Sequence, residues 1–154
     1  MKIIRGDRKG RGLKIGIVVS RFNQSITDRL LEGALEALKI TGVSSGRITL
    51  VSVPGAFEIP AVAKRLAETQ KPDAIVCLGA VIRGETEHFT YVCKAAQEGV
   101  TAVSLQSGVP ITFGVLTTDS IEQALARSTA GEANKGYEVA RDAVELANTF
   151  RLVR

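Results

Sequence analysis

The only histidine of the sequence follows a polar turn whose residue types suit proton transfer beside a bound anion. His88 ends the segment RGETEH, residues 83–88, which comes directly after an apolar run. Gly84 lets a ligand approach the backbone closely, and Thr86 is expected to cap a helix whose free N–H groups attract an anion. A histidine at such a place can exchange protons near neutral pH. An ordinary exposed or capping histidine fits the same pattern, so the residues alone leave both interpretations open.

Two other turns carry side chains suited to a flat, hydroxylated molecule. Phe22 lies in SRFNQ, residues 20–24, and could stack on a ring, although a hydrophobic staple on the next helix is the alternative. Glu58 lies in PGAFEIP, residues 54–60, where its carboxylate could accept hydrogen bonds from ligand hydroxyls. The dipole of the following helix would favour an acidic residue there as well.

Basic side chains later in the chain could bind a phosphate. Arg127 lies near the end of a short predicted helix, and Lys135 lies near the start of the last one. The forked guanidinium of Arg127 could clamp a phosphate or simply complement a helix C-terminus. The chain has no GxGxxG, GxxxxGK(S/T) or GxSxG motif and no cluster of metal ligands around its histidine. Dinucleotide, P-loop, serine-hydrolase and zinc sites are therefore not expected, which leaves acid–base chemistry on a small phosphorylated molecule.

The elements that must position these turns alternate between strand and helix. Short runs rich in Val and Ile predict buried parallel strands at 13–19, 48–53, 74–82 and 111–116. Helical periodicity follows each run. Ser25 and Asp28 indicate the start of the first helix, and Gly42 indicates its end. Ser120 and Gln123 indicate the start of another helix, and the last helix is predicted at 134–150. This order predicts an α/β fold, with a four-stranded parallel sheet between helices on both faces. Ligands of such sheets bind beyond the carboxyl ends of the strands, where all these turns lie.

Composition sets the broad class. The chain of 154 residues is 45% hydrophobic, which is enough for the core of one domain over 1–154. We expect this domain to consist of an N-terminal arm at 1–12 and an α/β core at 13–154. The arm is predicted to contain a short strand at 2–4. Its net charge of +4 and few aromatic residues argue against nucleic acid. No apolar run reaches the ~20 residues of a membrane helix, and no signal peptide is recognisable, so we expect a cytoplasmic protein. Cys77 and Cys93 are expected to be buried, reduced thiols.

Several motifs together resemble the lumazine synthase family. They are RFN at 21–23, PGAFEIP at 54–60, GAVIRG at 79–84 followed by Thr86, His88 and Phe89, GVLTTD at 114–119, and NKG at 134–136. The likeness runs from about Gly12 to Ala147, and the second and third motifs together are highly specific. The resemblance implies a flavodoxin-like three-layer sandwich.

The resemblance also implies a reaction. The family condenses 5-amino-6-(D-ribitylamino)uracil with 3,4-dihydroxy-2-butanone 4-phosphate to give 6,7-dimethyl-8-ribityllumazine, phosphate and water, the penultimate step of riboflavin biosynthesis. This is a transferase reaction that needs no metal or organic cofactor. Carried over by position, His88 would be the catalytic proton shuttle. The residues implied to bind the ribitylaminouracil are Phe22, Ala56, Phe57, Glu58, Ala80, Val81, Ile82 and Phe113. Those implied to bind the butanone phosphate are Glu85, Thr86, Arg127 and Lys135.

In the family, Phe113 and Arg127 come from an adjacent subunit, so the resemblance implies a homo-pentamer or a 60-subunit icosahedral shell, with riboflavin synthase as a candidate partner. Two departures stand out. Glu85 places an acid beside the implied phosphate, and the loop at 128–133 differs from the Gly/Lys-rich loop common in the family. The alternatives of the same fold are an archaeal-type riboflavin synthase, a flavin- or ligand-binding protein and a shell protein without activity.

Overall fold

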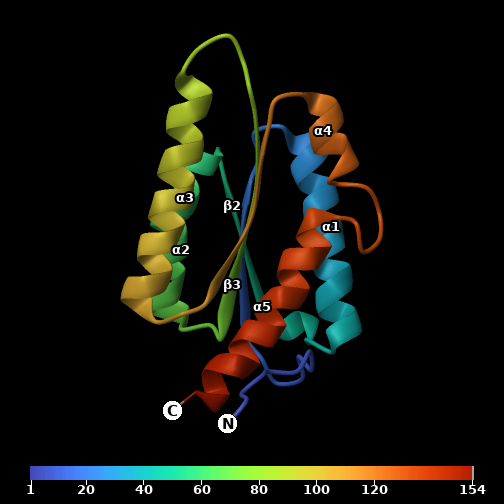
Figure 1. Ribbon diagram of the computed structural model, residues 1–154, viewed down its shortest axis with the longest axis vertical. Helices are drawn as coiled ribbons and strands as arrows, with labels where there is room; N and C mark the ends of the chain where they lie inside the picture. The colour runs from blue at the N-terminus through green and yellow to red at the C-terminus, as the bar shows by residue number, and fades with distance from the viewer. Residues whose placement is uncertain (154) are drawn as a thin grey trace.

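The computed structural model describes residues 1–153, and Arg154, the last residue of the predicted domain, lies outside them. It confirms the predicted α/β fold: four parallel strands form one sheet in the order β2-β1-β3-β4 (Figure 1). The strands are β1 (Ile15–Ser20), β2 (Ile48–Val53), β3 (Ala74–Ile82) and β4 (Ile111–Thr118). The helices are α1 (Gln24–Thr41), α2 (Ile59–Gln70), α3 (His88–Ser107), α4 (Ile121–Ala126) and α5 (Lys135–Leu152), with short 3-10 turns η1 (Ser45–Arg47) and η2 (Ala56–Glu58).

Two of the four strands differ from prediction in their bounds, and β1 also ends one residue later than predicted, at Ser20. β1 begins two residues late because the backbone N–H of Lys14 donates to the Asp73 carboxylate instead of to a neighbouring strand. β4 runs two residues further than predicted because Thr117 and Thr118 still pair with Val81 and Ile82 of β3. β2 and β3 have the predicted bounds.

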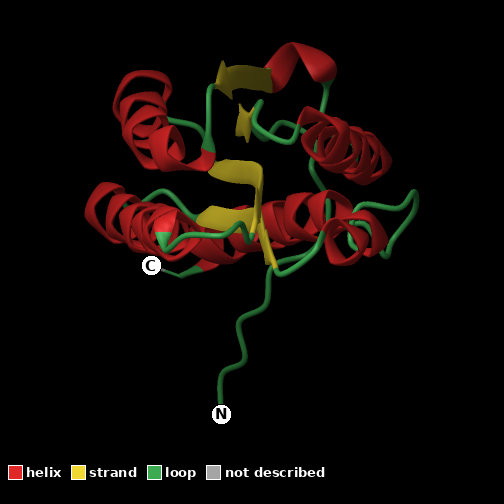
Figure 2. Cartoon of the chain, turned by 90° about the horizontal axis from the view of Figure 1, so that it is seen from above, coloured by secondary structure: helices red, strands yellow, loops and turns green. Residues whose placement is uncertain are grey.

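The sheet lies between two helical layers, as the view from above shows (Figure 2). Ile17 and Val19 of β1 face one core, which includes buried residues of α1 and α5, whereas Val18 faces the other core, against α2 and α3. This alternation is the period-2 geometry of a strand covered on both faces. The three-layer, flavodoxin-like sandwich is therefore confirmed. No helix within residues 1–153 is both long and apolar enough to cross a membrane.

Helix ends agree with the sequence signals only in part. Gly42 ends α1 in the left-handed region at φ 91°, and the Ser120 hydroxyl accepts from the Gln123 N–H, both as predicted. The capping box predicted at Ser25 is wrong, since α1 already begins at Gln24 after Asn23 at φ 58°. The Asn23 side chain instead donates to the Ala80 carbonyl at 2.9 Å and so ties this turn to β3.

The N-terminal arm lies against α5 without pairing with the sheet. The Gly6 N–H donates to the Thr149 hydroxyl, and the Asn148 amide donates to the carbonyls of Asp7 and Lys9. Residues 1–5 are exposed and extend away from the layers (Figure 2). The strand predicted at 2–4 is absent from the described chain, because these residues make no backbone hydrogen bond to another strand.

Both cysteines are free thiols, on β3 and α3. Cys77 is fully buried, as predicted, and burial raises the pKa of its thiol to about 12. Cys93 is only half-buried, and partial desolvation raises its pKa.

Candidate active site

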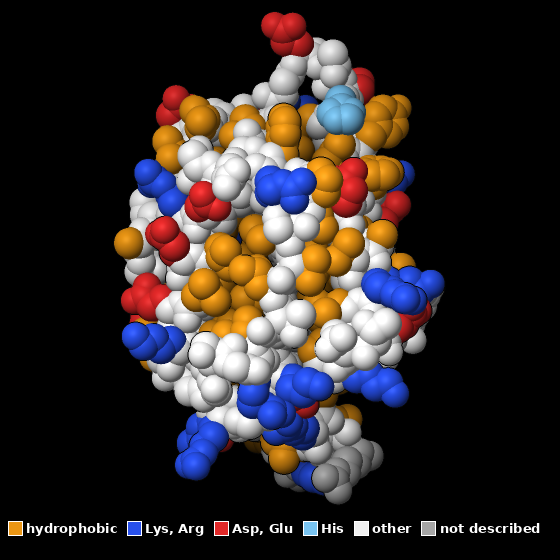
Figure 3. Space-filling model, turned by 180° about the vertical axis from the view of Figure 1, so that it is seen from behind, with side chains coloured by type: hydrophobic (Ala, Val, Ile, Leu, Met, Phe, Trp, Pro, Cys, Tyr) orange, Lys and Arg blue, Asp and Glu red, His pale blue; other side chains and the backbone are white. Residues whose placement is uncertain are grey.

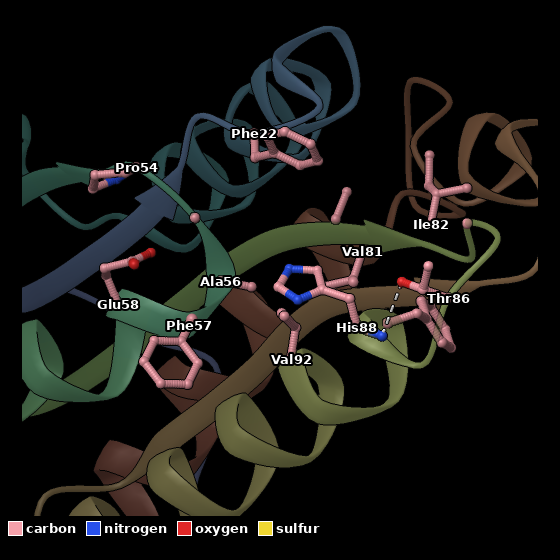
Figure 4. A pocket seen from close by; sticks show the side chains of 14 residues that line it. Phe22, Pro54, Ala56, Phe57, Glu58, Val81, Ile82, Thr86, His88 and Val92 are labelled. Carbon is pink, nitrogen blue, oxygen red and sulfur yellow. Dashed lines mark hydrogen bonds between the residues drawn. The ribbon is translucent and has the colours of Figure 1, made fainter.

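A cavity of about 670 Å³ opens beyond the carboxyl ends of β1, β2 and β3, where the topology of an open parallel sheet places ligand sites. Its volume lies within the range of small-molecule sites, and apolar side chains form most of its wall (Figure 4). The lining residues are Phe22, Pro54, Gly55, Ala56, Phe57, Glu58, Ala80, Val81, Ile82, Gly84, Thr86, His88, Phe89 and Val92.

The turn after β1 presents an aromatic ring at the mouth of this cavity. The N–H groups of Arg21 and Phe22 donate to the carbonyls of Val53 and Pro54, at 2.9 and 3.0 Å, and so hold the first two turns together. Phe22 is 72% exposed, more than a hydrophobic staple packed on α1 would leave. The exposed ring therefore suits stacking on a flat ligand.

The turn after β2 contributes a second aromatic ring and a carboxylate. Ala56, the first residue of η2, is buried, whereas Phe57 is 63% exposed. A Cβ at Gly55 would lie 3.0 Å from Glu58 Oε2, so the glycine leaves room for this carboxylate to fold back over the turn. Within residues 1–153 Glu58 has no ion pair or side-chain hydrogen bond, and its oxygens can accept from ligand hydroxyls.

The end of β3 and the start of α3 form the remaining wall. Ala80, Val81 and Ile82 end β3, and the His88 imidazole points from α3 toward Ala56 and Val81 (Figure 4). The predicted N-cap at Thr86 is wrong by one residue, since Glu87 occupies that place. The Thr86 hydroxyl nevertheless accepts from the His88 N–H at 3.3 Å.

The His88 ring is open to ligand and solvent. His88 is exposed, and the space-filling view shows the single histidine at one end of the molecule beside hydrophobic side chains (Figure 3). Its ring nitrogens have no hydrogen-bond partner among the described residues. A histidine with free nitrogens at an apolar cavity is placed to take up and return a proton.

Four of the predicted site residues do not line this cavity. Glu85 lies exposed in the loop before α3, and Phe113 packs on the core between the sheet and the α2–α3 layer. Arg127 Nη1 donates to the Gln123 carbonyl at the end of α4, and Lys135 Nζ pairs with Glu138 Oε1 at 3.0 Å. The part of the cavity formed by the described chain consequently has no lysine or arginine in its wall.

The sequence interpretation missed the hydrogen bonds that hold these turns. Asn23 belongs to a motif, but the sequence did not indicate its φ of 58° or the hydrogen bond from its side chain to the Ala80 carbonyl. Arg83, also in a motif, binds the Asp119 carboxylate at 2.7 Å, a hydrogen bond that raises the pKa of its guanidinium. No three metal-ligating side chains come together anywhere in residues 1–153.

The chain is a parallel α/β sandwich with an apolar cavity at its strand ends. Two exposed aromatic rings and an imidazole with free nitrogens line this cavity. These features are typical of a protein that binds a small molecule and has a group for acid–base chemistry. The family of 6,7-dimethyl-8-ribityllumazine synthase matches residues 12–151, nearly the whole chain. The chain belongs to this family.

Proposed function

We propose that this protein condenses 5-amino-6-(D-ribitylamino)uracil with 3,4-dihydroxy-2-butanone 4-phosphate to give 6,7-dimethyl-8-ribityllumazine, phosphate and water. Membership of the family supports a role in riboflavin biosynthesis. The observation that carries the specific reaction is the convergence of Phe22, Glu58 and His88, from three separate turns, on one cavity.

The cavity wall suggests a role for each turn toward the pyrimidine substrate. Phe22 stacks on the uracil ring at the mouth, while Ala56, Phe57 and Glu58 bind the ribityl chain, with Glu58 accepting from its hydroxyls. The uracil edge contacts residues 80–82 at the end of β3.

His88 and Thr86 lie on the side of the cavity that we assign to the phosphorylated ketone. The 5-amino group forms an imine with the ketone and releases water, and phosphate is then eliminated. The nitrogen that carries the ribityl chain closes the ring on the remaining carbonyl carbon, with loss of a second water. His88 transfers protons in these steps, and Thr86, with the backbone N–H of Glu85, binds phosphate oxygens.

The missing cation is the basis for proposing a site shared between subunits. A phosphate needs a positive partner, which the described cavity wall lacks, and neither Arg127 nor Phe113 lines the cavity of its own chain. We therefore propose that these residues, with Lys135 nearby, complete the cavity of a neighbouring copy in a homo-pentamer or a shell of 60 subunits. Residues 1–154 would act as one domain in the cytoplasm.

Mixing the purified protein with both substrates tests the reaction, because lumazine formation is detected by fluorescence. We expect product from the wild type and a rate about 10²–10⁴-fold lower for His88→Ala. Ile40→Ala is the control, since Ile40 is 65% exposed at the far end of α1. Absence of product from the wild type would reject the function, and full activity of His88→Ala would reject the role of the histidine.

The shared site is tested by mixing subunits of two impaired variants. Refolding His88→Ala together with Arg127→Ala should raise the activity above that of either variant refolded alone, because some cavities then receive His88 from one copy and Arg127 from the other. No recovery in oligomers proved by mass to be mixed would contradict the shared site. Sedimentation distinguishes the pentamer from the shell.

A further inference from the structure

The loop that carries Thr86 and leads to His88 has few attachments to the rest of the fold. Residues 83–87 are all exposed, and the connection from β3 to α3 arches beyond the end of the sheet in Figure 1. Gly84 has open space around it and no side chain to restrain its backbone. Of these five residues as described, only Arg83 hydrogen-bonds to an element other than α3.

Arg83 makes three contacts that together form a clasp. Its N–H donates to the Thr118 carbonyl at 2.8 Å, which extends the β3–β4 pairing by one step. Its Nε donates to Asp119 Oδ1 at 2.7 Å, a short, charge-assisted hydrogen bond. Its guanidinium carbon lies 4.4 Å from the centre of the Phe89 ring, within the range of a cation–π contact. Phe89 also lines the cavity, so the clasp acts directly on the cavity wall.

The backbone of Asp119, whose carboxylate binds Arg83, is itself held in place. The Asp119 N–H donates to Gln123 Oε1 at 2.8 Å, and the Gln123 N–H donates to the Ser120 hydroxyl at 3.2 Å. These two hydrogen bonds fix the turn between β4 and α4. Arg83 thus attaches the sparsely held loop to a well-held one.

We propose that Arg83, through Asp119 and Phe89, is a positioning residue that sets the place of Thr86 and His88. This inference rests on the proposed function, which assigns those two residues to the phosphorylated substrate and to proton transfer. The residues assigned to the ribityl chain belong to the separate turn after β2, which the clasp does not contact. Residues 80–82, assigned to the uracil edge, are held in β3 by their pairing with β4. Loosening the clasp should therefore affect one substrate and the chemistry, but not the other substrate.

Kinetics of Arg83→Gln and Asp119→Asn test whether the clasp affects the butanone phosphate and not the ribitylaminouracil. We expect the KM for the butanone phosphate to rise about five- to tenfold and kcat to fall, as loss of an exposed charge pair with a cation–π contact implies. The Kd for ribitylaminouracil alone should stay within about twofold. Arg83→Lys should recover part of the loss, because it keeps the charge without the fork. Lys94→Gln is the matched control, since it removes an exposed ion pair with Glu98 on α3 that lies outside the cavity wall.

Hydrogen exchange gives a readout that does not depend on activity. The amides of residues 84–88 should exchange faster in Arg83→Gln and Asp119→Asn than in the wild type or Lys94→Gln. Unchanged exchange in both clasp variants, or equal weakening of both substrates, would overturn the proposal. If the wild type forms no lumazine, the proposed function fails, and the exchange rates still decide whether the clasp holds the loop.

Discussion

Replacing Phe22 with alanine should weaken binding of the pyrimidine substrate without changing the stability of the fold, because the ring lines the cavity and is not part of the core. Phe22 is 72% exposed. Substitutions at such surface positions usually change the free energy of unfolding by no more than about 0.5 kcal/mol. The fold of Phe22→Ala should therefore be as stable as that of the wild type, as urea unfolding can measure.

The effect on the pyrimidine substrate should be much larger. Stacking of a base on an aromatic side chain contributes about 1–3 kcal/mol, which corresponds to a Kd about 5- to 150-fold higher after truncation. The assay is equilibrium binding of ribitylaminouracil in the absence of the second substrate. Phe22→Tyr keeps the ring and should retain most of the affinity.

Ile40→Ala provides the comparison for Phe22→Ala. Ile40 is 65% exposed, and it lies at the opposite end of α1 from the cavity. We expect no change in the Kd or in the unfolding free energy. An unchanged Kd for Phe22→Ala would refute stacking, and a loss of stability equal to the loss of binding energy would show that the ring supports the fold instead.

Further substitutions test how the elements are held. Gly136→Ala should destabilise the protein by ~1–3 kcal/mol in urea unfolding, since the added methyl would overlap the Leu30 carbonyl between α5 and α1; wild-type stability would contradict that close packing. Asn134→Ala should cost about 1–2 kcal/mol, because the side chain accepts from two N–H groups at the start of α5, and an unchanged unfolding midpoint would count against the cap. Burial raises the pKa of the Cys77 thiol from 9.0 to about 12, so the folded protein keeps a proton that the unfolded chain loses. Stability that is complete below pH 9 should fall between pH 9 and 12 by roughly 1 kcal/mol per pH unit, a component that Cys77→Ala should lack; equal slopes for the two proteins would exclude it.

The fold could be predicted from the sequence because its signals are local and repeated. Continuous apolar runs with Val and Ile indicate strands covered on both faces, and the bounds of β2 and β3 were predicted correctly. The predicted starts of β1 and α1 are wrong because groups distant in the sequence form hydrogen bonds there. The Asp73 carboxylate displaces the start of β1, and the Ala80 carbonyl stabilises Asn23 in the left-handed region at the start of α1.

The candidate site was predicted only in part. Turns that follow adjacent parallel strands must meet at the same edge of the sheet, so Phe22, Glu58 and His88 were expected together. Their convergence on one cavity agrees with that expectation. Arg127 and Lys135 lie elsewhere on the described chain, since α4 and α5 belong to the other helical layer. A local sequence pattern carries no information on contacts between copies.

The two sides of the cavity are held with different rigidity, and this bears on how the proposed reaction would proceed. Backbone hydrogen bonds join the turns after β1 and β2, so the surface assigned to the uracil and ribityl chain is formed before any ligand binds. The side that carries His88 depends on the exposed loop at 83–87 and its clasp. Placing two reactants together can supply ~7–11 kcal/mol, whereas proton transfer by one side chain contributes about 10²–10⁴-fold, or roughly 3–5 kcal/mol. The rigid side would thus supply much of the rate by orienting the amine, while the loop follows the ketone as it becomes an imine and loses phosphate. In the proposed reaction His88 would assist each step but positioning would contribute more, which is why removal of the imidazole should slow the reaction without abolishing it.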